Sequence, residues 1–197
     1  MPLIREALVV TRSAAGRAHI APMGAQALLL DDGAAGVLLQ PFRPSTTLDN
    51  LLAGGCATLN HVDDVRIIAG CLTGRHDWPL LPAATIGCDR LAVALAHLEL
   101  EVDRIDDDAQ RPRVRLRVRH QVNHAPFPGF NRAKAAVIEA AILVSRLHML
   151  APGKIDSEIE YLRIAIDKTG GAEEIEAWGW LLEAIAAKRR PRATGAP

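Results

Sequence analysis

The chain has 197 residues, of which 49% are hydrophobic, 23% are charged and only 4% are aromatic. This composition excludes a disordered chain and can build a substantial core, chiefly from Ala, Leu, Val and Ile. Lys plus Arg and Asp plus Glu number 23 each, so the formal net charge is zero. Such a chain has no overall positive field, so neither nucleic acid nor an anionic membrane is expected as a partner.

The same sequence points to a cytoplasmic protein. No apolar run reaches the roughly 18 residues that a membrane-crossing helix needs. The first residues lack the basic segment, apolar stretch and cleavage site of a signal peptide. The three cysteines, Cys56, Cys71 and Cys88, are an odd number without metal-type spacing. Reduced thiols are the simplest account of them.

Up to about residue 125, short apolar runs are separated by Gly, Pro and Asp, which is typical of strands joined by turns. In chain order, strands are expected at residues 4–11, 17–22, 25–30, 37–42, 57–60 and 65–68. A short helix is expected at 47–53, ended by Gly54 and Gly55.

The clearest local pattern is a hairpin of residues 98–103 and 113–122. Apolar residues alternate with acidic residues in its first strand and with arginines in its second. A register centred on Asp108 would place Asp103, Glu101 and Glu99 opposite Arg113, Arg115 and Arg117. Facing opposite charges contribute about 0.2–1 kcal/mol each. The arginines are therefore interpreted as a solvated face rather than as a nucleic-acid site.

After residue 125, helical spacing predicts three helices. Asn131 can cap the first, and Ser157–Glu160 has the pattern of a capping box that opens the second. Acidic residues near the start of the third and basic residues near its end suit the helix dipole. Pro191 ends it, and a loose end is expected beyond. We therefore expect two domains, 1–125 and 126–197.

The most informative segment runs from residue 40 to 51, where a strand ends and three hydroxyl residues, Ser45, Thr46 and Thr47, lead into a helix. The first amides of a helix point outward with partial positive charge. Together with Arg43 they would suit a phosphate group. The alternative is that Thr46 or Thr47 merely caps the helix. Glycine-rich Rossmann and P-loop motifs are absent, so those nucleotide sites are not supported.

The histidines lack the clustered spacing that a zinc site needs. His120 and His124 stand four residues apart beside a predicted strand end, while His19 and His61 lie elsewhere. We expect surface or hydrogen-bonded histidines and no metal. Spacing alone defines no catalytic triad, so the catalytic residues stay unknown.

Four segments occur in an order that characterises a known family: residues 19–24, 41–51, 60–64 and 129–140. Through them the chain resembles the FMN-binding split-barrel superfamily. Within that superfamily it resembles DUF447, a family catalogued as a domain of unknown function and known from methanogenic archaea and methylotrophic bacteria. The resemblance implies an α+β fold, in which an FMN-binding split β-barrel is followed by a C-terminal helical region. It also implies a homodimer with FMN between the subunits.

The resemblance further implies which residues hold FMN. Those expected at the phosphate are Arg43, Ser45, Thr46, Thr47 and Asn50. Those expected along the ring system are Ala21, Pro22, Met23 and Gly24. Asn60 would orient the pocket or belong to a turn. Arg132 would reach the cofactor or the neighbouring subunit, whereas Asn131 fits a helix cap better.

The leading hypothesis is a redox flavoprotein, similar to a flavin reductase, in which FMN performs the electron chemistry and the protein supplies position and shielding. Its partners would be a reduced electron carrier or a small flat substrate. Two alternatives stay open: a non-catalytic FMN-binding protein, and an assembly module whose helical tail is the partner surface. Whether the protein is an FMN-dependent oxidoreductase is left undecided by the sequence.

Overall fold

The computed structural model describes residues 3–189. These residues form two compact units, one containing residues 3–63 and 76–128 and the other containing 64–75 and 129–189. The chain therefore leaves the first unit for a short excursion into the second before it returns. The loose end expected after Pro191 lies outside the described residues.

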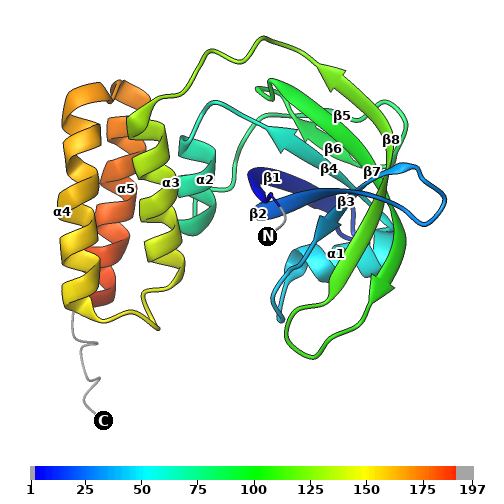
Figure 1. Cartoon of the computed structure of the whole chain (residues 1–197), viewed down its shortest axis with the longest axis horizontal. Coiled ribbons are helices and arrows are strands. Elements are labelled where there is room, and N and C mark those ends of the chain that lie inside the picture. The colour runs from blue at the N-terminus through cyan, green and yellow to red at the C-terminus, as the bar shows by residue number, and fades with distance from the viewer. Residues whose placement is uncertain (1–2, 190–197) are drawn as a thin grey trace. The chain divides into compact units, whose positions relative to one another are not determined.

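Six antiparallel strands of the first unit close into a barrel in the order β1-β2-β3-β8-β7-β4 (Figure 1). Their bounds are β1 (Arg5–Arg12), β2 (Ala18–Leu29), β3 (Ala35–Leu39), β4 (Cys56–His61), β7 (Ala96–Asp106) and β8 (Arg113–Asn123). Pairing of β1 with both β2 and β4 closes the ring. Closure removes the free strand edges that would otherwise invite pairing with other chains.

The barrel core follows from alternation along the strands, since successive side chains point to opposite faces. Val9, Leu39, Leu59, Leu100 and Leu116 meet in one buried cluster. Aliphatic side chains fill this cluster, as the low aromatic content predicts.

Helix α1 (Thr46–Gly54) adds two side chains to the same cluster. Leu48 and Leu51 are each 1% exposed. Ser45 caps the helix, because its Oγ accepts a hydrogen bond from the Leu48 N–H at 3.2 Å. Gly55 ends it in the left-handed conformation with φ of 66°, which glycine adopts without a Cβ penalty. The expected helix and its glycine stop are confirmed.

A two-stranded sheet of β5 (Leu80–Pro82) and β6 (Asp89–Leu91) accompanies the barrel. It is tied to β4, since the Thr58 hydroxyl donates to the Asp89 carbonyl at 2.6 Å. The sequence pattern did not predict this small sheet.

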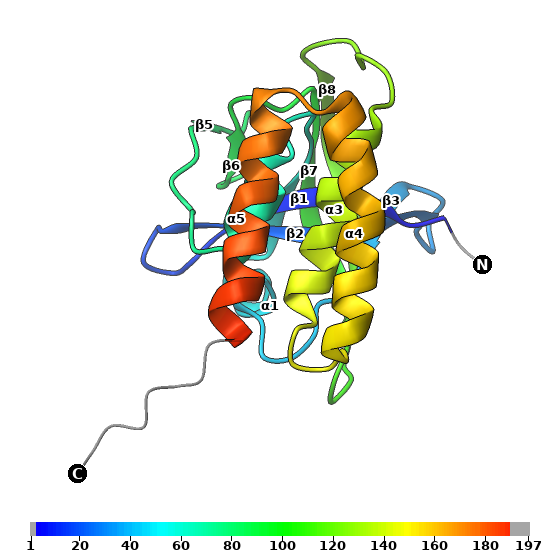
Figure 2. The ribbon, with the colours of Figure 1, turned by 90° about the vertical axis from the view of Figure 1, so that its left-hand side faces the viewer.

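The second unit contains α2 (Arg66–Leu72), α3 (Arg132–Ser145), α4 (Pro152–Thr169) and α5 (Ala172–Arg189). Helices α3, α4 and α5 lie side by side (Figure 1, Figure 2). The buried stripe of α3 is mostly alanine, which lets helix backbones approach closely. Among the described residues, no helix combines the length and apolar character needed to cross a membrane. The expected α+β fold, a barrel followed by a helical region, is confirmed.

The sequence predicted the cap of α3 correctly but not the start of α4. The side-chain oxygen of Asn131 accepts from the amides of Ala133 and Lys134 at 2.8 and 3.1 Å, which confirms it as the cap of α3. The expected capping box at Ser157 is wrong. Helix α4 already begins at Pro152, a residue favoured in the first turn because its missing N–H needs no partner there.

Two strand predictions also need correction. Residues 65–68 lie at the start of α2, where Ile67 and Ile68 are buried. A short apolar run does not distinguish a strand from a buried helix segment, which explains the error. The strands expected at 17–22 and 25–30 are one continuous strand, β2.

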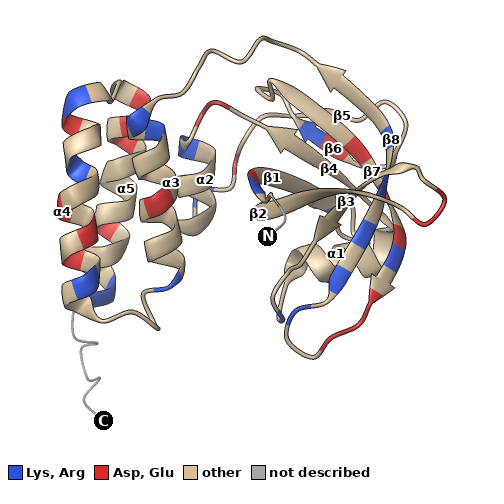
Figure 3. Ribbon diagram, in the orientation of Figure 1, with Lys and Arg blue, Asp and Glu red and all other residues tan. Residues whose placement is uncertain are grey.

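The arginines of β8 follow the strand as a charged stripe (Figure 3). The arginines do pair with acidic residues, for example Arg117 with Asp103 at 2.8 Å and Arg119 with Glu101 at 2.6 Å, but these are not the pairs that were predicted. The predicted register is wrong, because Glu101 faces Arg117 and β7 is irregular between Glu99 and Leu100 and again after Val102. An inserted residue in a bulge shifts the pairing without disturbing the alternation that a sequence displays.

Replacing Leu51 with alanine should lower the free energy of unfolding by about 2–5 kcal/mol, because it leaves a cavity in the cluster that holds α1. Leu52→Ala is the matched control, since Leu52 is 56% exposed, and should change stability by less than about 0.5 kcal/mol. Chemical denaturation followed by circular dichroism measures both. Equal effects would contradict the packing of α1 described above.

Candidate functional site

A small pocket lies where β3 leads toward α1. Its volume is about 190 Å³, and it is lined by Pro22, Met23 and Gly24 of β2, by Gln40, Pro41 and Phe42, and by Arg111. The structure thus brings residues 22–24, expected at the ring, beside residues 40–42, which precede the segment expected at the phosphate. None of the residues expected at the phosphate lines this pocket. We call this region the β3–α1 corner.

The loop between β7 and β8 is fastened to the corner by backbone and side-chain hydrogen bonds. The Arg43 N–H donates to the Gln110 carbonyl at 2.9 Å, and Nε of Arg111 donates to the Gln40 carbonyl at 3.2 Å. The guanidinium of Arg111 also lies 4.6 Å from the centre of the Phe42 ring. Arg111 therefore supplies a positive charge at the pocket. Sequence analysis missed it, because Arg111 follows an ordinary polar turn.

The three hydroxyl residues are not equivalent. Ser45 is half-buried and caps α1, Thr46 is exposed, and Thr47 is 1% exposed. The first amides of α1 have no intrahelical partners and carry partial positive charge. The donors that suit an anion are thus the Thr46 hydroxyl and the first-turn amides, whereas the Thr47 side chain is turned away from solvent. The alternative, that Thr46 or Thr47 caps the helix, is wrong, because the cap is Ser45 and both threonines lie within α1.

Arg43 contacts the loop between β7 and β8. Its guanidinium donates to the Asp107 carboxylate at 2.6 Å and to the Asp108 carbonyl at 3.2 Å. The Arg43 and Asp107 side chains are 39% and 80% exposed. An ion pair this exposed contributes only about 0–1 kcal/mol, so a stronger anion can displace it.

Asn50 and Asn60 point away from the corner. The Asn50 amide donates to the Thr11 hydroxyl at 2.9 Å in the interior. Asn60 is fully buried, donates to the Leu8 carbonyl at 3.2 Å and accepts from the Leu91 amide at 2.9 Å. The Asn60 side chain therefore joins β1, β4 and β6 and is engaged by protein groups.

The expected ring-lining residues lie on β2 opposite β1, with Ala21 paired to Val9 and Gly24 paired to Glu6. The Met23 side chain packs against the barrel core. Exposed Arg132 begins α3 in the second compact unit.

A second polar group lies on β7, where the sequence predicted only a solvated face. Glu99 is fully buried, and its carboxylate accepts from the Ala84 and Thr85 amides at 2.7 and 2.6 Å and from the Thr85 hydroxyl at 2.5 Å. His97 Nε2 lies 3.2 Å from Glu99 Oε1. The predicted pairing of Glu99 with Arg117 is wrong, because the segment between β5 and β6 covers this face of β7.

Opposing effects set the ionisation of Glu99. Burial acts to raise its pKa, but the donors from Thr85, Ala84 and His97 outweigh burial. The pKa is therefore lowered from 4.5 to about 2. Glu99 is a carboxylate at neutral pH and can only accept hydrogen bonds.

The cysteines provide no reactive group. Burial is the main effect on the thiols of Cys71 and Cys88 and raises the pKa of each to about 11. Thiols with raised pKa are poor nucleophiles and poor metal ligands. In the part of the chain that the structure describes, no three His, Cys, Asp or Glu side chains are grouped to hold a metal.

Several solved structures share this fold. An FMN-bound DUF447 protein from Methanosarcina mazei matches with a TM-score of 0.78 at 20% identity, over 93% of this chain and 96% of that one. The 2-nitrobenzoate 2-nitroreductase of Pseudomonas fluorescens matches with a TM-score of 0.53 at 21% identity, over 63% and 66% of the two chains. Flavoredoxin from Methanosarcina acetivorans matches with a TM-score of 0.52 at 10% identity, over 63% and 69%.

Family models identify the chain itself. Residues 5–125 match the "Protein of unknown function (DUF447) N-terminal domain", and residues 131–183 match the "Protein of unknown function (DUF447)". The chain therefore belongs to the DUF447 family, as its ordered motifs indicated. No curated protein sequence matches it.

Asn60→Ala should lower the free energy of unfolding by about 1–3 kcal/mol, because it leaves the buried Leu91 amide and Leu8 carbonyl without these partners. Asn123→Ala, at an exposed position of β8, is the control and should be near neutral. Thermal or chemical denaturation measures the difference. An Asn60 variant of unchanged stability would show that the pairing of β1 with β4 does not need the hydrogen bonds of this amide.

Glu99 predicts a specific acid sensitivity. Its folded pKa of about 2 lies below the ordinary 4.5, so its stabilisation is complete above pH 4.5 and is lost as the pH falls toward 2. The loss amounts to about 3 kcal/mol. Unfolding free energies measured across this range should fall less steeply for Glu99→Gln than for the wild type. Glu101→Gln, at a partly exposed position, should keep the wild-type slope.

Proposed function

We propose that this protein binds FMN at the β3–α1 corner and serves as a redox flavoprotein. The observation that carries the proposal is that β2 residues 22–24 and residues 40–42 line one pocket beside the start of α1, with a guanidinium at its wall. The FMN-bound DUF447 protein from Methanosarcina mazei supports the choice of FMN as the ligand. Residues 22–24, which the resemblance implies for the ring system, lie beside residues 40–42, which lead into the segment that it implies for the phosphate.

The phosphate is held at the start of α1. The Thr46 hydroxyl and the first-turn amides donate to its oxygens, and the helix dipole favours its negative charge. Ser45 keeps these amides in place by capping the helix. The Thr47 side chain is buried, so this residue contributes through its backbone.

Two arginines complete the anion site. Arg111 faces the pocket, and its stacking on Phe42 holds the guanidinium in position. Arg43 exchanges its exposed ion pair with Asp107 for the phosphate. This exchange is favourable because a guanidinium binds phosphate oxygens through two parallel hydrogen bonds. Asn50 and Asn60 stabilise the barrel around the site rather than contacting the phosphate.

The ring system lies along residues 21–24 of β2. Pro22 has no N–H to desolvate. At Gly24 the absent side chain makes room for Ile4, since an added Cβ would lie 2.7 Å from Ile4 Cγ2. The Met23 side chain packs inward, so the backbone of this segment forms the contact. When bound, FMN supplies reversible transfer of one or two electrons.

A second copy of the chain completes the site in a homodimer. Phe42 is 65% exposed at the wall of the pocket, and Ile4 near the start of β1 is 52% exposed. Covering such apolar side chains is a usual role of a subunit interface. The unit of residues 3–63 and 76–128 would hold the flavin, and Arg132 of the helical unit would contact the neighbouring subunit.

One observation also favours a protein that binds FMN without catalysis. The residues that line the pocket are Pro, Met, Gly, Gln, Phe and Arg, none of which titrates near neutral pH. Electron transfer to a carrier or to a small flat substrate needs no such group, and neither does storage of FMN. Stopped-flow mixing of the reduced protein with acceptors separates these functions, since uniformly slow oxidation indicates storage.

The purified protein should be yellow, or should become so on addition of FMN. Arg111→Ala and Arg43→Ala should each weaken FMN binding about tenfold to a hundredfold, the loss expected for a charge-assisted hydrogen bond. Quenching of FMN fluorescence measures the dissociation constants. Arg113→Ala is the control, because Arg113 is exposed at the start of β8.

Protein that stays colourless with excess FMN would refute the assignment. Equal affinities for all three variants would place FMN elsewhere on the chain. Sedimentation with and without FMN tests the dimer independently, since a monomer that retains FMN would remove only the subunit interface from the proposal.

A further inference from the structure

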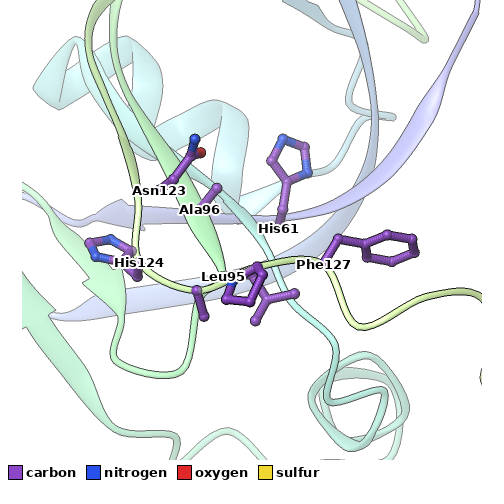
Figure 4. Close-up of a pocket in the computed structure, with 8 residues that line it drawn as sticks. His61, Leu95, Ala96, Asn123, His124 and Phe127 are labelled. Carbon is purple, nitrogen blue, oxygen red and sulfur yellow. The ribbon is translucent and has the colours of Figure 1, made fainter.

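A further pocket of the first compact unit lies at the ends of β4, β7 and β8. Its volume is about 580 Å³, and its lining includes His61, Leu95, His124 and Phe127 (Figure 4). Backbone hydrogen bonds fix its walls: the Leu95 N–H donates to the His61 carbonyl at 2.8 Å, and the His124 N–H donates to the Leu95 carbonyl at 2.7 Å. The pocket shares no lining residue with the β3–α1 corner.

A chain of three side chains connects this pocket to the buried carboxylate on β7. Glu99 Oε1 lies 3.2 Å from His97 Nε2, and His97 Nδ1 lies 2.9 Å from His124 Nε2. The two imidazole rings are nearly parallel, with 9° between their planes and their centres 5.0 Å apart. Glu99 and His97 are 0% and 3% exposed, whereas His124 is exposed and lines the pocket. The chain therefore runs from the interior to the pocket.

The hydrogen bonds determine where the protons lie. The Glu99 carboxylate can only accept, so Nε2 of His97 carries a proton and donates it to Glu99. When both rings are neutral, Nδ1 of His97 is then an acceptor, and Nε2 of His124 must be the donor. A neutral imidazole has one donor and one acceptor nitrogen. Nδ1 of His124 is consequently left with a lone pair.

We propose that this pocket is a second ligand site, in which Nδ1 of His124 accepts a hydrogen bond from a small molecule with a weakly acidic O–H group. A phenol is the ligand class that fits. Its ring matches the apolar lining from Leu95, Ala96, Pro126 and Phe127, and its hydroxyl would donate to Nδ1 of His124. His97 and Glu99 are positioning residues that hold His124 in the accepting tautomer.

Burial and the positively charged or titratable groups around His124 favour its neutral form. Burial, Arg90 and His97 lower the pKa of His124, in that order. His120 lies edge-on to His97 with ring centres 6.5 Å apart, and His61 lines the same pocket. Burial is also the main cause that lowers the pKa of His61. At neutral pH the acceptor form of His124 therefore predominates.

The tautomers can be read directly from long-range ¹H–¹⁵N spectra of protein with ¹⁵N-labelled histidine. At about pH 7.5, one unit above the ordinary histidine pKa, His97 and His124 should both carry their proton on Nε2. Glu99→Gln should move both protons to Nδ1, because the amide that replaces Oε1 donates to His97. Thr85→Val is the control, since it removes one donor to Glu99 but keeps the carboxylate, and should leave both tautomers unchanged.

Ligand binding is tested with phenol and with anisole, its methyl ether, which lacks the donor. Phenol should shift the amide resonances of residues 61, 95–96 and 123–127 and should bind about two- to tenfold more tightly than anisole, the value of one hydrogen bond. His124→Ala should remove this preference while leaving binding of FMN unchanged. The wild-type spectrum alone decides the tautomers if Glu99→Gln does not fold.

Three outcomes would overturn the proposal. A proton on Nδ1 of His124 in the wild-type protein would remove the acceptor. Phenol shifts outside these residues, or no shifts, would remove the ligand site. Equal affinity for phenol and anisole would show that the pocket binds by apolar contact only. Because FMN binding is measured separately, none of these results bears on the β3–α1 corner.

Discussion

Closure of the barrel between β1 and β4 is the constraint on which the rest of the first unit depends. The amide of Asn60 lies at this seam, fully buried, and bonds to groups of β1 and β6 as well as to its own strand. A buried amide that loses its partners costs about 1–3 kcal/mol, so a slipped register is penalised. With β1 fixed, residues 21–24 of β2 are fixed opposite it, and β3 then delivers the chain to α1.

Strand β7 serves two environments at once. Leu98, Leu100 and Val102 face the barrel cluster, while His97 and Glu99 lie on the opposite face of the strand. That face is not solvated, because the segment between β5 and β6 supplies three donors to Glu99. A carboxylate is tolerated in the interior only where such donors replace water. The segment between β5 and β6 therefore holds the Glu99 side chain in place and keeps it charged.

The parts of the fold that the sequence predicted are those set by local periodicity and by caps. The strand alternation around Arg113, the glycine stop at Gly55 and the cap at Asn131 were all readable, because each depends on a few neighbouring residues. The errors arose where distant segments decide. The register of β7 against β8 depends on bulges, and burial of Glu99 depends on Ala84 and Thr85, some fifteen residues upstream.

The same limit applies to the candidate site. Ser45 and Thr46 could be proposed from the sequence because hydroxyls before a helix have a defined chemistry. Arg111 could not, since its place at the pocket follows from the docking of a loop onto Gln40. Family resemblance supplied the remaining residues without distinguishing ligands from scaffold. Asn60 shows why that distinction requires a structure, because its amide is the expected residue type but its hydrogen bonds are made within the barrel.

Saturation of hydrogen bonds separates the two kinds of polar residue in this protein. The side chains of Asn60 and Glu99 are buried and engaged by protein donors and acceptors, so they fix geometry and cannot also take up a ligand. Thr46 and His124 are exposed and retain capacity for a further partner. At each of the two proposed sites, a side chain whose hydrogen bonds are made within the protein holds one that can still take a partner. Ser45 fixes the helix start that presents Thr46, and Glu99 acts through His97 to fix His124. Because its buried polar groups position the exposed ones, the barrel can present two chemically different surfaces. One surface is suited to an anion and the other to a weak acid.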